Sequence, residues 1–235
     1  MNSQKISVDF NEEKVIELTS FSDLEIECKK DSKLILKLAN FSNQENLKIT
    51  ANLGQNAKFD VVFADFSNAN ISLIAQVNLN ENGASCNWHL ATLSNKEFLK
   101  KFDVSFTHVV GHTNALMDNY GVARDNSQIT FTGISYIKEH AVQSVTAQNA
   151  KIIVFDKSAR GVASPILKID ENDVQASHGA VVGQLNEDHL FYLMSRGLSN
   201  QEARALITLG YLQPISKEFS EKIQDKIAKS IQEAM

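Results

Sequence analysis

The sequence predicts a mainly β protein that ends in a small helical region. Over residues 1–184, short segments alternate apolar and polar residues or are rich in β-branched residues, which is typical of strands. Small polar residues that favour turns separate these segments. After Gln184 the apolar spacing changes to that of amphipathic helices. We therefore expect a β domain over residues 1–184 and a helical domain over residues 185–235.

The β region is built from short strands and small turns. The clearest strand segments are 33–38, 46–51, 58–63, 70–77 and 129–134. The turn candidates are Gly54-Gln55-Asn56-Ala57, Asn68-Ala69-Asn70, Asn82-Gly83-Ala84, Arg124-Asp125-Asn126 and Gln148-Asn149-Ala150. Several turns recur about 14 residues apart before the spacing drifts, and no strict short repeat occurs. The pattern indicates a sandwich, a barrel or an irregular β-solenoid, and it lacks the alternating helices of a doubly wound sheet.

Capping residues predict the first two helices. Asn186 can cap a helix that runs to about Met194, with Gly197 just beyond its end. Ser199 and Glu202 form a capping box at the start of a second helix. We expect Gly210 and Pro214 to end that second helix.

A third helix is expected to open at Ser216. Its apolar residues recur every four positions, at Phe219, Ile223, Ile227 and Ile231, on an otherwise charged helix. So narrow an apolar stripe must pack on another surface. We expect that surface to be the body of the protein, and a partner is the alternative.

The composition excludes several classes of protein. The chain of 235 residues carries 23 Lys and Arg against 28 Asp and Glu, and its net charge of -5 gives nucleic acid no basic surface to bind. The N-terminal segment lacks the apolar core of a secretory signal, and no apolar stretch approaches the ~18 residues of a membrane span. Cys28 and Cys86 are isolated and predict no disulfide, so we expect a cytoplasmic protein without nucleic-acid or membrane partners.

Six histidines raise the question of a metal site. His108 and His112 have i,i+4 spacing, but the residues between them favour a strand, in which the two rings lie too far apart to share an ion. For each of the five histidines other than His178, a structural or surface role is the expectation: they are His89, His108, His112, His140 and His189. No phosphate-binding glycine loop, nucleophile elbow or carboxylate cluster occurs, so no catalytic residue and no enzyme activity is expected. A cupin-like metal-binding enzyme stays as the alternative.

The segment 177–209 resembles a known family. Its sequence is SHGAVVGQLNEDHLFYLMSRGLSNQEARALITL. It is similar to the SufB/SufD family of SUF iron–sulfur cluster assembly proteins, in which SHGAT-VGQL precedes an acidic turn, LFYL-x-SRG and a helix rich in Glu, Ala and Leu. The SufD type is the nearer of the two. Weaker similarity extends over roughly residues 100–215.

The resemblance implies a fold and a function. The fold would be a right-handed parallel β-helix followed by a small helical domain. The function would be that of a non-catalytic subunit, which pairs through its β-helix with a SufB-like partner or as a homodimer. Its C-terminal helices would bind SufC, an ABC-type ATPase. No cofactor would be bound stably, and an iron–sulfur cluster or iron would be shared transiently with the partner.

The resemblance also implies site residues. His178 matches the histidine of the family motif at the cluster assembly site, where a neutral imidazole can bind iron and Asp173 or Ser177 can orient its second nitrogen. Equally, a histidine between Ser177 and Gly179 can serve only to satisfy backbone groups. The residues that match the SufC-binding segment are Arg196, Gly197, Leu198, Glu202, Ala203, Leu206 and Ile207.

The sequence departs from the family in several ways. Val181 replaces the motif threonine, no cysteine lies near Gln148, and the family's N-terminal helical region has no counterpart in the resemblance. We therefore expect a reduced, SufD-like protein whose partner supplies any sulfur ligands. A third interpretation is a purely structural homodimer that no longer takes part in cluster assembly.

Overall fold

The computed structural model of the protein describes residues 3–42 and 45–235, so residues 1–2 and 43–44 of the predicted β domain lie outside the described residues. The strands are β1 (Gln4–Val8), β2 (Glu13–Leu18), β3 (Asp23–Cys28), β4 (Lys33–Asn40), β5 (Asn46–Leu53), β6 (Lys58–Asp65), β7 (Ile71–Leu79), β8 (Ser85–Ser94), β9 (Leu99–His108), β10 (Asn114–Ala123), β11 (Gln128–Ile137), β12 (Val145–Val154), β13 (Arg160–Ile169) and β14 (Gln175–Gln184). The helices are α1 (Glu187–Ser195), α2 (Asn200–Ser216) and α3 (Glu221–Ala234).

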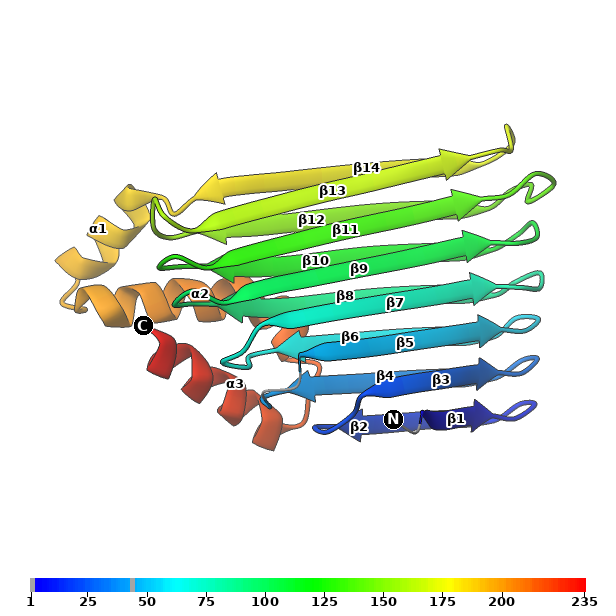
Figure 1. Ribbon diagram of the computed structural model, residues 1–235, viewed down its shortest axis with the longest axis horizontal. Coiled ribbons are helices and arrows are strands. Elements are labelled where there is room, and N and C mark those ends of the chain that lie inside the picture. Colours follow the sequence, from blue (N-terminus) through cyan, green and yellow to red (C-terminus); the bar gives the residue numbers. More distant parts are fainter. Residues whose placement is uncertain (1–2, 43–44) are drawn as a thin grey trace.

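The strands form two parallel sheets that the chain visits in turn. The odd-numbered strands make one seven-stranded sheet, the odd sheet, and the even-numbered strands make the other, the even sheet. All neighbouring strands are parallel, for example β1 with β3 and β12 with β14. Two successive strands therefore make one rung of a β-solenoid, and the rungs stack along the sheets (Figure 1). This confirms the predicted parallel β-helix and decides against a sandwich or an antiparallel barrel.

The rungs lengthen along the chain. In the first rung Gln4 pairs with Leu24, 20 positions further on, whereas near the end Gln128 pairs with Arg160, 32 positions further on. Two turns fall in every rung, which explains why turn residues recur at about half a rung and why their spacing drifts. The strands lengthen in step, from five residues in β1 to ten in β14.

Most of the predicted turns are confirmed, and one is wrong. Asn56 and Gly83 occupy the left-handed backbone region, at φ of 54° and 79°, in the turns before β6 and β8. The segment 148–150, predicted as a turn, lies instead in the middle of β12. There the side chain of Gln148 donates to Ser135 Oγ inside the solenoid, and Asn149 donates to Asp118 Oδ1 outside it. Partners in the sheets therefore override the turn preference of these residues.

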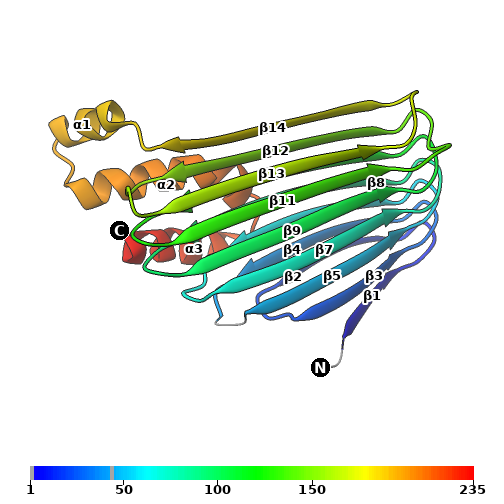
Figure 2. The same ribbon diagram turned by 45° about the horizontal axis from the view of Figure 1, so that its top comes forward.

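The helices cover part of the even sheet. Helix α3 buries Ile223, Ile227 and Ile231 in a cluster with Leu212 of α2 and with apolar residues on the outer face of the even sheet. The expectation that the stripe packs on the body is confirmed. The larger hydrophobic cluster lies between the two sheets and contains no helix residue. Figure 2 shows α2 and α3 beside the sheets and α1 projecting past the end of β14.

Two helix boundaries differ from the prediction. Helix α2 continues through Gly210 and Pro214 to Ser216, because Leu212 and Ile215 are buried against the even sheet. Helix α3 begins after Ser220 rather than at Ser216, since Ser220 donates its backbone N–H and its hydroxyl to Glu17 of β2. The caps at Asn186 and at Ser199 with Glu202 are confirmed.

Within the described residues, no helix has the length and apolar character needed to cross a membrane.

Candidate functional site

The last rung of the solenoid has no neighbour on its far side. Strands β13 and β14 end their sheets, and we call this pair the open rung. Each strand therefore presents a row of backbone N–H and C=O groups that the described part of the chain does not pair. Nearly every residue of β14 is exposed. Such an edge is a template for pairing with another strand.

The inward side of the open rung is mainly small and apolar. Because their partners in β11 and β12 are buried, the inward positions are known from the register: Gly161, Ala163, Pro165, Leu167, Ile169, Ala176, His178, Ala180, Val182 and Gln184. A further rung stacked on this one would cover these positions. In its absence from the described residues, Val182 is 46% exposed and Ile169 is 40% exposed. An exposed apolar surface that is bounded by two unpaired strand edges is typical of an interaction site.

His178 is the titratable side chain on this inward surface. It pairs in register with Gln148 and ends an inward column that runs through Trp88 and Met117 in the rungs below. The imidazole is exposed, and no hydrogen bond joins it to Asp173 or Ser177 in the part of the chain that the structure describes. The predicted orientation by either residue is therefore not seen. The imidazole is therefore accessible at the surface that a partner would cover.

The other histidines do not build a metal site. His108 ends β9 and points into the solenoid, where its Nδ1 lies 2.7 Å from Thr113 Oγ1. Burial lowers the pKa of His108 to about 4, so its ring is neutral. His112 lies in the turn that follows, at φ of 58°, and not on a continuous strand as predicted. Among residues 3–42 and 45–235, no three His, Cys, Asp or Glu side chains are placed to hold an ion.

Both cysteines are buried inside the solenoid. Burial raises the pKa of the Cys28 thiol to about 12, with Glu27 adding to the effect. Burial also raises the pKa of the Cys86 thiol well above its usual value, with a smaller contribution from Asp60. Neither thiol ionises near neutral pH, and neither reaches the surface. The chain itself therefore offers no thiolate for a cluster.

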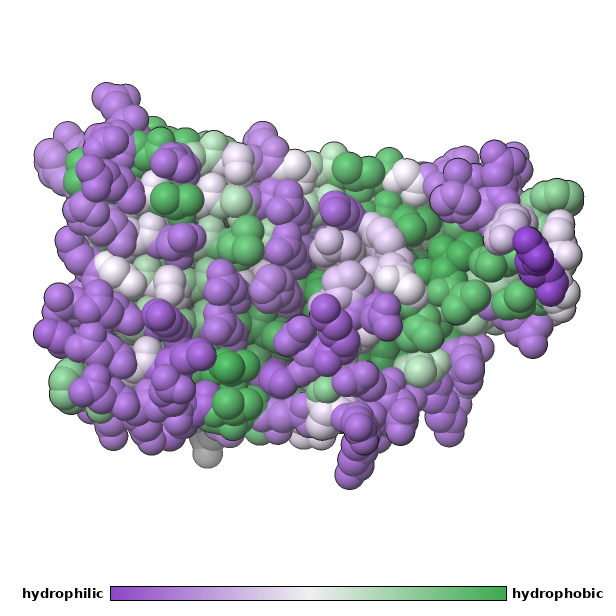
Figure 3. Space-filling view, turned by 180° about the vertical axis from the view of Figure 1, so that it is seen from behind, coloured by the Kyte–Doolittle hydropathy of each residue, from purple (hydrophilic) through white to green (hydrophobic). Residues whose placement is uncertain are grey.

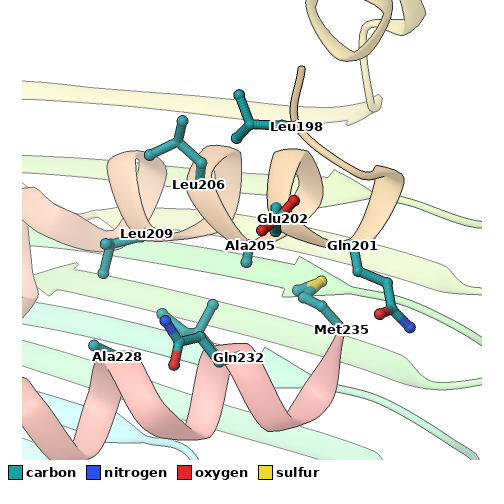
Figure 4. A pocket seen from close by; sticks show the side chains of 10 residues that line it. Leu198, Gln201, Glu202, Ala205, Leu206, Leu209, Ala228, Gln232 and Met235 are labelled. Carbon is teal, nitrogen blue, oxygen red and sulfur yellow. The ribbon is translucent and has the colours of Figure 1, made fainter. Parts of the chain in front are cut away.

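A second candidate surface lies between the helices. An apolar groove of about 440 Å³ runs between α2 and α3 (Figure 4). Its lining residues are Leu198, Gln201, Glu202, Ala205, Leu206, Leu209, Ala228, Ile231, Gln232 and Met235. Figure 3 shows a broad apolar area at the helical end of the molecule. We call this surface the helical groove.

The residues predicted to bind the ATPase are only partly gathered at this groove. Leu198, Glu202 and Leu206 line it, and Leu206 is 48% exposed. Arg196 and Gly197 lie beside it in the turn after α1, where Arg196 stacks on Tyr192 of the preceding helix turn.

Ala203 and Ile207 lie on the other side of α2. Ala203 is fully buried, and Ile207 packs against the cluster on the even sheet. Ala203 therefore offers no free surface to a partner, and Ile207 is only partly exposed. The groove residues that were not predicted as partner-binding are Gln201, Ala205, Leu209, Ala228, Ile231, Gln232 and Met235. Their four-residue spacing was visible in the sequence, but the packing of α3 beside α2 was not.

A protein-family profile identifies the chain's relatives. The profile of the SufBD core domain, described as SUF system FeS cluster assembly, matches residues 15–211. The chain belongs to the SufB/SufD family. The match begins in β2 and ends in α2, so it includes the open rung and extends well upstream of residues 100–215, which carry the sequence resemblance.

Individual SufB/SufD proteins match a shorter part. The chain is 35% identical to the iron–sulfur cluster assembly protein SufD of Bacillus subtilis over 122 residues, which are 52% of this chain and 28% of that protein. It is 28% identical to SufD of Escherichia coli over 119 residues, 51% of this chain and 27% of that protein. It is 26% identical to SufB of Bacillus subtilis over 111 residues, 47% of this chain and 24% of that protein. The chain is thus SufD-like, and the aligned part spans about a quarter of each relative.

Proposed function

We propose that this protein is a non-catalytic subunit of the SUF iron–sulfur cluster assembly system. It pairs through its open rung with a SufB-like partner or with a second copy, and it binds a SufC-type ATPase through the helical groove. The observation that carries the proposal is the open rung, where an apolar inner surface and an exposed His178 lie between two unpaired strand edges. Membership of the SufB/SufD family supports it.

Pairing at the end of the solenoid fits the surfaces better than pairing along its sides. Helices cover much of the even sheet, and the outer face of the odd sheet is mostly polar. The opposite end is partly closed, because Lys14 of β2 donates to the carbonyl of Ser7 in β1 and lies 2.9 Å from Glu12. A lysine over a strand edge discourages addition of another strand. The open rung lacks such a charge on its inner surface.

The cluster is cargo in this proposal, and the chain contributes little to holding it. A neutral imidazole at His178 can bind iron. The buried, protonated thiols of Cys28 and Cys86 cannot supply sulfur ligands. A SufB-like partner, rather than a second copy of this chain, must therefore bring thiolates to the interface, so a cluster site is complete only in the mixed pair.

The helical groove is the proposed site for the ATPase. Its floor is apolar, and Leu206 on its rim is exposed. Arg196 and Glu202 place opposite charges beside it. An apolar groove bordered by charged residues suits a transient protein partner.

Co-purification with a SufB-like protein and a SufC-type ATPase tests both surfaces. We expect a ternary complex in which Val182→Asp weakens pairing with the SufB-like chain and Leu206→Asp weakens binding of the ATPase. His178→Ala should preserve the complex and lower its iron–sulfur content. Ile74→Asp, an exposed apolar residue on the odd sheet, is the matched control and should change nothing.

The outcomes separate the alternatives. A complex that tolerates both Val182→Asp and Leu206→Asp contradicts the assigned surfaces. Normal cluster content in His178→Ala favours the structural homodimer. Stoichiometric metal on the isolated chain that is lost on changing His108 and His112 favours the metal-binding enzyme.

Removal of the residues after Gln184 tests the division into two domains. We expect the truncated chain to lose the ATPase and to keep its β-sheet signal in circular dichroism, because the core between the sheets contains no helix residue. Truncation also uncovers Val62 and Leu93 on the even sheet and Phe66 just after β6, so the shortened chain should bind hydrophobic dyes. Retained ATPase binding by the truncated chain contradicts the proposed docking site.

A further inference from the structure

The interior of the solenoid becomes polar just below the open rung. Asn119 of β10 and Gln148 of β12 point inward and are only 2% and 3% exposed. Neither Asn119 Oδ1 nor Gln148 Oε1 accepts a hydrogen bond from any residue that the structure describes. A buried acceptor without a partner is unfavourable by about 1–3 kcal/mol, and native proteins usually satisfy it with water when no protein group is near.

The orientation of the Gln148 amide is fixed by its other atom. Gln148 Nε2 donates to Ser135 Oγ at 2.7 Å and to the carbonyl of Ile166 at 3.2 Å. Ser135 Oγ also accepts from Thr146 Oγ1 at 2.8 Å. A flipped amide would place an oxygen against the carbonyl of Ile166, so Oε1 must face away from these groups.

Both unpaired oxygens belong to residues that line one small cavity. The cavity offers about 10 Å³ to the centre of a water molecule, and its other lining residues are Met117, Phe131, Gly133, Asn149, Ala150 and Pro165. A space of roughly 10–15 Å³ by this measure holds one water. No carboxylate or cationic side chain lines it, so nothing there compensates the charge of an ion.

We infer that one ordered water occupies this cavity and donates its two hydrogens to Asn119 Oδ1 and Gln148 Oε1. Water matches the site in volume, in its number of donors and in its neutrality. It closes a polar network that joins Asn119 of β10 to Ser135 of β11, Thr146 and Gln148 of β12 and Ile166 of β13. The water thereby links the rung that carries His178 to the rungs below.

Gly133 keeps room for this water site. A Cβ at this position would lie 2.6 Å from Gln148 Oε1 and 3.0 Å from Met117 Sδ. Both contacts are too close, so any side chain would displace the amide that binds the water. The glycine is needed for space and not for backbone freedom, since its φ is not in the left-handed region.

Magnetisation transfer from water to methyl groups tests the inference on the isolated full-length chain. With Met and Ala methyls labelled, we expect cross-peaks from long-lived water to the methyls of Met117 and Ala150, which line the cavity. Ala75 in the dry interior of β7 should show none. Asn119→Leu, which removes one acceptor at similar size, should abolish both cross-peaks.

The matched control is Asn78→Leu on the outer face of the odd sheet, which should keep both cross-peaks. Absence of the cross-peaks in the unmodified chain, or their persistence in Asn119→Leu, overturns the water site. The measurement on the unmodified chain decides the question even if Asn119→Leu does not fold. It is also independent of partner binding, so it stands or falls separately from the proposed function.

Discussion

The middle rungs and the open rung of the solenoid differ in how completely their interiors are filled. In the middle, Phe63 stacks on Trp88 with ring centroids 6.5 Å apart and meets Phe102 edge-on at 6.1 Å. In the open rung many inward positions hold small residues such as Gly161 and Ala163, and the larger apolar ones, among them Val182, stay partly exposed. Large aromatic side chains give the middle rungs stability that needs no partner. The last rungs bury little apolar area of their own, so they gain most from a second chain.

The largest difference should appear when large side chains are truncated. Phe102→Ala removes a ring packed between Phe63 and Phe131, and we expect the free energy of unfolding to fall by about 3–5 kcal/mol. Leu167→Ala on the half-buried inner face of β13 should lower it by less than about 1 kcal/mol. Urea denaturation of the two variants measures the contrast. Equal losses would show that the open rung is as tightly packed as the middle.

The middle rungs also contain a fully buried ion pair. Lys100 Nζ lies 2.6 Å from Asp65 Oδ2 and donates to the carbonyl of Ser67 at 2.8 Å. Lys100→Met leaves the Asp65 carboxylate without its cation, and we expect a loss of about 3 kcal/mol in urea denaturation. Lys101→Met changes the next residue, whose side chain is exposed, and should change the free energy of unfolding by less than about 0.5 kcal/mol. An unchanged Lys100→Met variant would mean that water reaches this pair.

Stability should also depend on pH through one residue of the middle rungs. Burial lowers the pKa of His108 to about 4 in the folded chain, below the 6.5 expected when unfolded. As pH falls below 6.5, the unfolded chain takes up a proton that the folded chain does not. Stability is therefore complete above pH 6.5 and declines toward pH 4, with a loss of about 2 kcal/mol at pH 5.

Urea denaturation at pH 7.5 and pH 5 measures this contribution. His108→Gln should remove it, whereas His112→Asn, in the exposed turn nearby, should keep it. An equal pH dependence in His108→Gln and the unmodified chain would assign the effect to other groups.

The comparison also shows what the sequence could reveal. Turn residues such as Asn56 and Gly83 marked the ends of strands, because only a few residue types accept the left-handed backbone there. The apolar stripe of α3 predicted burial correctly. His178 could be located from its motif, but its place on an uncapped rung depends on which strands stack, and the changing rung length hid that register.

Other features could not be predicted from the sequence, because the residues that form them are distant from one another in the chain. Asp65 and Lys100 form their pair across 35 positions, and neither residue alone signals burial. Gln148 belongs to a predicted turn but lies in β12, because its partner Ser135 is in the other sheet and is not visible from the local sequence. The helical groove forms only because α3 packs beside α2, and that packing could not be predicted from either helix alone. In each case tertiary contact decides what local preference leaves open.

The smallest effect on stability is expected for a substitution in the open rung at Val182, which ends an inward column of side chains. Val182 of β14 stacks directly on Ile152 of β12, which is 1% exposed. Ile152→Asp buries a carboxylate without a partner and should prevent folding or cost several kcal/mol. Val182→Asp, one rung higher, should change the stability of the dilute, unpaired chain by less than about 0.5 kcal/mol, because its carboxylate stays in water.

The concentration dependence of this pair of variants distinguishes an open rung from a closed one. If a second chain covers the rung, the unmodified protein should become more stable as its concentration rises, whereas Val182→Asp should not. Urea midpoints across a hundredfold range of concentration, with light scattering to count chains, give both readings. A large loss for Val182→Asp at the lowest concentration would mean that the last rung is closed within a single chain. In that case the contrast with the middle rungs would concern composition alone.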